Sequence, residues 1–163
     1  MNDEKLTRIV EAVAKQITEA KADEKNFGLK KAKKLIAMVE AKAKTMGLNV
    51  VVAVSNEAGR PIAIECMDNS YIASYDVALN KAYTVVALKM STEKLSGLAK
   101  PDGPLYGIQH TNGGQIVIFG GGEPLIYHGK IVGGLGVSGG SAEQDSALAT
   151  YGVSCLDEIM KEN

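Results

Sequence analysis

One lysine of this 163-residue chain lies where an amine could do chemical work. Small and apolar residues recur at helical spacing over residues 71–90, which predicts a helix, and Lys81 lies beside its small, apolar face. An amine at the edge of a buried surface can bind an anion or form a Schiff base. More often it pairs with a carboxylate or extends its ammonium to water. Both interpretations of Lys81 stay open on the sequence alone.

Imidazole, a versatile metal ligand, occurs only twice in the chain. His128 falls in an expected hairpin turn, where a histidine is usually an exposed bystander. His110 falls in the irregular stretch 99–114, and loops of this length in compact domains are often functional. His110 is therefore the better candidate for a metal ligand.

The glycine-rich segment 116–145 is the third candidate for a site. Short apolar runs separated by glycine predict antiparallel strands at 116–119, 124–127 and 131–137. Ser141 and Gln144 then have the spacing of a capping box, so a final helix begins there, and its N-terminus can hold an anion. We expect a backbone-lined binding corner here, formed with Lys81 by Gly120, Gly121, Gly122, Ser138, Gly139 and Gly140.

Residues 134–139 match the dinucleotide pattern G-x-G-x-x-G, between a strand and a helix. The fingerprint also requires a second parallel strand after that helix, with an acid that binds the ribose. The chain ends at Asn163, in or just after the helix, so we interpret the match as coincidental. Asp145 at the start of the helix is accounted for by the helix dipole.

Several function classes are excluded or disfavoured by what the sequence lacks. It has no Ser-His-Asp arrangement, no cysteine–histidine spacing for zinc and no P-loop, so a binding or assembly domain is favoured over an enzyme. The formal net charge of −1 gives no basic field for nucleic acid. The absence of a long apolar run or signal peptide predicts a cytoplasmic protein that does not enter a membrane.

The predicted elements describe an α+β domain. Helices at 29–46 and 71–90, hairpin strands at 50–55 and 62–66, and the three later strands predict a central antiparallel sheet of about five strands with helices packed on it. We divide the chain into an amphipathic helix with a polar linker (1–26) and the main domain (27–163).

Four stretches, in this order, resemble the GlcG/HbpS-like family, which includes the C-terminal domain of PduO-type corrinoid adenosyltransferases. They are VAVSNEAGRPIAIECMD (52–68), NKAYT (80–84), FGGGEPL (119–125) and VGGLGVSGGSAEQD (132–145). The resemblance implies a homo-oligomer of up to eight copies that binds haem or a corrinoid, accessory to a bacterial microcompartment or a redox pathway. If haem binds, His110 is the expected iron ligand. The helix at 29–46 lacks the histidine that some haem-binding relatives use, and the adenosyl-transfer domain is missing, so that activity is not implied.

The first helix, expected over residues 3–20, has one apolar stripe: Leu6, Ile9, Val10, Val13 and Ile17. A lone helix of this length is marginal in water, so the stripe requires a partner. With the polar linker after it, it resembles the encapsulation peptides of microcompartment cargo, which implies docking on shell or cargo proteins. Packing within its own oligomer is the alternative. An assembly protein with no small-molecule ligand is accordingly the rival of the tetrapyrrole-binding hypothesis.

Overall fold

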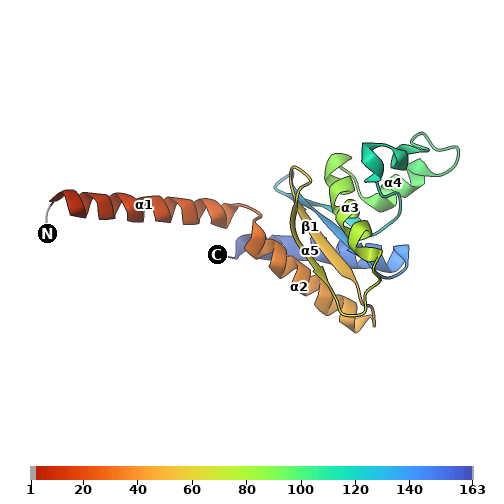
Figure 1. The fold of residues 1–163 in the computed structure, drawn as a ribbon, viewed down its shortest axis with the longest axis horizontal. Helices are drawn as coiled ribbons and strands as arrows, with labels where there is room; N and C mark the ends of the chain where they lie inside the picture. Colours follow the sequence, from red (N-terminus) through yellow and green to blue (C-terminus); the bar gives the residue numbers. More distant parts are fainter. Residues whose placement is uncertain (1–2, 163) are drawn as a thin grey trace.

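The computed structural model describes the backbone of residues 3–162 and the side chains of residues 4–17 and 26–162. Helix α1 (Asp3–Lys25) extends away from the rest of the chain as a single rod (Figure 1). The helix runs through almost all of the segment expected to be a polar linker, and only Asn26, Phe27 and Gly28 separate it from α2 (Leu29–Thr45). The expected end of this helix at residue 20 was therefore wrong, because charged residues and alanine at 21–25 continue a helix as readily as they form a linker.

Four strands form the sheet: β1 (Val51–Asn56), β2 (Pro61–Cys66), β3 (Gly122–Tyr127) and β4 (Lys130–Ser138). Their order is β2-β1-β4-β3, and every neighbouring pair is antiparallel. The α+β class and the antiparallel sheet are confirmed, with four strands where about five were expected. Residues 116–119 are not a strand: the Val117 amide donates to the Thr84 hydroxyl at 3.0 Å, so this run packs on a helix instead of joining the ladder.

Helices cover both faces of the sheet. Along β1, Val52 and Val54 face the layer made by α2 and α5 (Ala142–Lys161), which lie side by side in Figure 1. Val51 and Ala53 face the opposite layer, which is α3 (Ser74–Ala87). This alternation follows from the two-residue period of a strand, and it buries β1 on both sides.

Helix α3 lies unusually close to β4, and two glycines permit it. A Cβ at Gly134 would collide with the Ala82 carbonyl oxygen, and a Cβ at Gly136 with the Ala78 carbonyl oxygen. These two glycines belong to the G-x-G-x-x-G match, and the strands that flank β4 are both antiparallel to it. The pattern therefore serves helix–sheet packing, and its interpretation as a coincidental match is supported.

The remaining elements form the end of the domain away from α1. Helix α4 (Thr92–Ala99) is followed by a long loop with two single 3-10 turns, Ile108–His110 and Asn112–Gly114.

The predicted capping box at the start of α5 is confirmed: the Ser141 hydroxyl accepts from the Gln144 amide at 3.2 Å, and the Gln144 side chain accepts from the Ser141 amide at 2.9 Å. In the described part of the chain, none of the helices has the length and apolar character needed to span a bilayer.

Candidate functional site

The centre of the candidate site is a buried ion pair that joins three elements. The Lys81 ammonium, from α3, donates to the Asp145 carboxylate of α5 at 2.9 Å and to the Val137 carbonyl oxygen of β4 at 2.7 Å. The two side chains are 0% and 4% exposed. The Phe119 ring covers the ammonium, with its centroid 4.9 Å from the nitrogen, which is a cation–π distance. Of the two interpretations that the sequence left open for Lys81, the structure shows the carboxylate pair.

Asp145 is held from both sides. One carboxylate oxygen accepts from Lys81 and the other accepts from the Gly140 amide at 2.8 Å, ahead of the first turn of α5. Burial raises the pKa of Asp145, and the attraction of Lys81 opposes this. Burial likewise lowers the pKa of Lys81, opposed by Asp145. Desolvation is thus the larger influence on both, and each charge depends on the other to remain buried.

The glycine corner packs inward on this pair. A Cβ at Gly121 would lie 2.5 Å from the Lys81 nitrogen, 2.6 Å from the Asp145 Cβ and 2.7 Å from the Val137 carbonyl oxygen. Its neighbours are equally enclosed, since a Cβ at Gly120 would meet the Ser146 hydroxyl and one at Gly122 would meet Thr92. Close packing of the protein thus requires these glycines in its own right, and their direct contact with a ligand stays a prediction.

Gly121→Ala is expected to destabilise the domain. At φ +115° the position is strained for any residue with a Cβ, and the added carbon has rigid or tightly held neighbours. Together these effects predict a loss of roughly 2–4 kcal/mol in the free energy of unfolding. Gly97→Ala, in α4 with open space around its Cβ, is the matched control and should be neutral or slightly stabilising. Urea titration of both variants measures the difference, and equal midpoints would contradict this account.

Hydroxyl groups fix the loops that surround the ion pair. The Thr92 hydroxyl accepts from the Gly122 amide at 2.8 Å, and the Ser138 hydroxyl donates to that of Ser74 at 3.1 Å, both in buried positions. Sequence reasoning assigned Asp145 to the helix dipole and missed its pairing. The available signal was a lysine on an apolar helix face, which requires a carboxylate, together with an acid directly after a glycine-rich turn.

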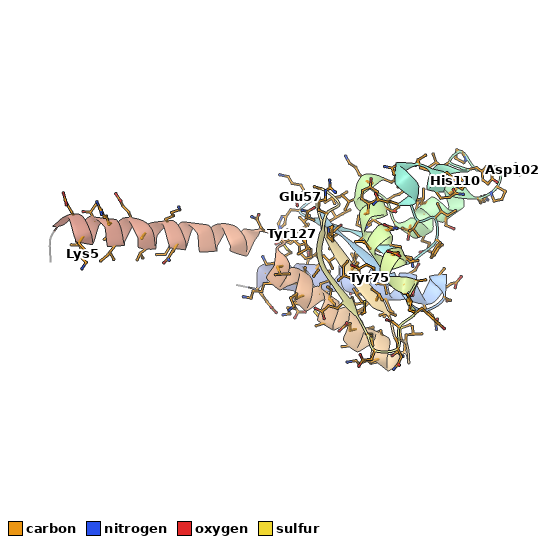
Figure 2. All side chains as sticks on the ribbon, in the orientation of Figure 1. Lys5, Glu57, Tyr75, Asp102, His110 and Tyr127 are labelled. Carbon is orange, nitrogen blue, oxygen red and sulfur yellow. The ribbon has the colours of Figure 1, made fainter. Side chains whose placement is uncertain are left out.

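The two histidines lie far apart. His110 is exposed in the loop after α4, at the end of the domain opposite α1 (Figure 2). His128 forms the tight turn between β3 and β4, where its ring meets Tyr127 edge-on with centroids 4.1 Å apart, and Tyr127 lies on the side nearer α1 (Figure 2). The structure brings together Lys81, Gly121 and, through Asp145, Gly140, whereas His110 belongs to a separate loop.

The side chain of Gln109 adjoins the ring of His110. The ring Nε2 lies 3.5 Å from the Gln109 amide nitrogen, while the Gln109 Oε1 is buried without a hydrogen-bond partner in the described part of the chain. The two amide atoms of glutamine are distinguished only by their hydrogen bonds, so a reversed amide would let Oε1 accept from the ring. Such a bond to one ring nitrogen fixes the tautomer and leaves the other nitrogen to bind a metal. Among the described residues, no group of three or more His, Cys, Asp or Glu side chains could hold a free metal ion.

Comparison with known proteins identifies the family. The model of the family described as "Haem degrading protein HbpS-like" matches residues 27–154. The chain belongs to the HbpS-like family. The match leaves α1 outside and includes the ion pair, the glycine corner and both histidines.

Three relatives in or near this family are informative. A 15.0 kDa protein from the dhaT-dhaS intergenic region of Citrobacter freundii is 43% identical over 128 residues, which is 78% of this chain and 90% of the relative. The crystal structure of Klebsiella pneumoniae protein ORFY has a TM-score of 0.78 at 38% identity, covering 80% of this chain and 90% of that one. A structure named "PduOC:Heme Complex" has a TM-score of 0.76 at 32% identity, covering 79% and 94%.

This chain is also similar to part of a larger enzyme. The corrinoid adenosyltransferase PduO of Salmonella typhimurium is 35% identical over 116 residues, and this chain spans only 34% of its length. The HbpS structure from Streptomyces reticuli is more distant, with 26% identity and a TM-score of 0.72. The expected resemblance to HbpS and to PduO is thus confirmed.

Proposed function

We propose that this chain is a non-catalytic, homo-oligomeric domain that binds a tetrapyrrole, haem in the first place and a corrinoid as the alternative. We place it in the cytoplasm, accessory to a redox pathway or within a bacterial microcompartment. One observation carries the proposal: at 32% identity the chain covers 94% of a structure named as a haem complex. Relatedness to a corrinoid adenosyltransferase supports the alternative ligand.

His110 is the proposed iron ligand. Its imidazole is exposed, Gln109 adjoins its ring, and Tyr106, four residues earlier in the same loop, is 68% exposed and offers an aromatic surface. A bound haem would supply a redox-active iron. Lys81 could touch a ligand only if the Phe119 ring moved off its ammonium. We therefore propose that the glycine corner maintains the packing around the Lys81–Asp145 pair, while His110, in its separate loop, binds the metal.

Titration of the purified chain with haemin tests the proposal. A saturable change in the Soret absorbance would support haem binding, and the same titration with hydroxocobalamin tests the corrinoid alternative. If neither ligand binds saturably, the tetrapyrrole hypothesis is wrong and the assembly interpretation remains. Light scattering tests the oligomer separately, because a stable species of 17.2 kDa at micromolar concentration would contradict it.

The second candidate is an assembly protein recruited through α1, to a microcompartment shell or to other cargo. The observation that favours it is that α1 extends away from the domain with its apolar stripe between 46% and 57% exposed (Figure 1).

Deletion of residues 1–25 tests the proposed division at residue 26. The truncated chain is expected to unfold cooperatively in urea, since the sheet and its two helix layers are all retained. Loss of solubility or of partner binding, with the fold kept, is the expected defect. A truncated chain without a cooperative transition would place α1 in the core and contradict the division.

A further inference from the structure

Helix α1 has an uncharged face wider than its apolar stripe. In a heptad register with Leu6 and Val13 at d and Val10 and Ile17 at a, the flanking e and g positions are Thr7, Ile9, Ala14 and Gln16. All five charged residues between 4 and 17 then occupy the outer positions b, c and f; they are Glu4, Lys5, Arg8, Glu11 and Lys15.

This charge pattern indicates what covers the face. In coiled coils, charged residues at e and g select a partner of opposite sign, and α1 has none there between residues 4 and 17. The charged e and g positions of this register, Lys21 and Asp23, come after the apolar stripe. The face is therefore complementary to itself: identical helices can meet along it without repulsion. Ile9 at g, which is 46% exposed, makes this apolar seam broader than the a and d positions alone.

The attachment of α1 fixes the direction of its neighbours. Only three residues join it to α2, and Phe27 among them is buried in the domain core at 7% exposure. In a ring of domains related by cyclic symmetry, all copies would therefore present their α1 helices from the same end. We propose that the α1 helices of several copies of this chain pack in parallel through the face formed by Leu6, Ile9, Val10, Val13 and Ile17.

Disulfide trapping in the full-length chain tests this proposal. In a Cys66→Ser background, which removes the exposed native thiol, Val10→Cys places a cysteine at a, where like positions of parallel helices face one another. Mild oxidation is expected to convert most of this variant to a disulfide-linked dimer. Glu11→Cys, one residue away at the outer b position, is the matched control and should cross-link little. Equal cross-linking of the two variants, or none in either, would overturn the proposal.

A charge placed on the face gives an independent measurement. Val13→Glu should lower the mass measured by light scattering, or lower the helical circular dichroism because the separated helix frays, whereas Lys15→Glu on the outer face should change neither. If Val13→Glu matches the parent in both, α1 does not pack on its own copies. In that case binding of the parent to a purified shell protein would assign the face to that partner instead. Haemin binding is read separately, so failure here leaves the tetrapyrrole proposal unaffected.

Discussion

Lys81→Met is expected to lower the free energy of unfolding by about 3–5 kcal/mol, because it leaves the Asp145 carboxylate buried without its cation. Asp145→Asn keeps an oxygen that can accept from the Gly140 amide, yet it leaves the ammonium with the Val137 carbonyl and the Phe119 ring alone. A loss of similar size is expected for that variant. Urea denaturation followed by circular dichroism measures both.

The double variant Lys81→Met/Asp145→Asn separates charge from packing. Because it contains neither charge, its loss in the free energy of unfolding should be smaller than the sum of the losses of the two single variants. Its stability should equal or exceed that of the more stable single variant. Additive losses would show that the pair acts through shape alone and would contradict this account.

The pH dependence of Lys81→Met supplies a further check. Burial raises the pKa of Asp145, and removal of Lys81 takes away the attraction that opposes that rise. A carboxyl whose folded-state pKa lies above its unfolded value stabilises the fold below the unfolded pKa and loses this contribution as pH rises. The deficit of Lys81→Met relative to the parent should therefore shrink as the pH falls toward the usual range of an aspartate. A deficit that is constant with pH would contradict the charge argument.

The sequence predicted most of the fold because its local patterns were unambiguous. Three local patterns each specify one structure, and all three are present: the apolar run at 50–55, the hairpin that joins it to 62–66, and the capping box at Ser141. The prediction of a strand at 116–119 was wrong. These residues have the composition of a strand, but the Val117 amide donates to the hydroxyl of Thr84 in α3. Propensity cannot anticipate a partner that is more than thirty residues distant.

The candidate site was predictable only in part. Lys81 and the glycine corner were both chosen from the sequence, and they do meet, but no sequence pattern connects them through Asp145. A glycine in the sequence can mean that a ligand approaches the backbone closely or that a helix of the protein does. Only the three-dimensional structure distinguishes these two explanations. At Gly121, Gly134 and Gly136 the close neighbours are atoms of the protein itself.

His110→Ala is expected to weaken haemin binding by more than about tenfold and to shift the Soret band, because loss of an axial imidazole changes both the affinity and the electronic state of the iron. His128→Ala is the matched control: His128 is exposed at the two-residue turn between β3 and β4, in a different part of the chain from the loop of His110, and should change little. Spectra and affinity that are unchanged in both variants would show that the iron ligand is not histidine.

Crystallography of the haemin-bound full-length chain, with anomalous scattering recorded at the iron edge, is the most direct measurement of the central claim. The account predicts an iron peak at coordination distance, roughly 2 Å, from a ring nitrogen of His110, with the Lys81–Asp145 pair intact. An iron peak beside any other side chain, or haemin-treated crystals with no ordered iron, would contradict it.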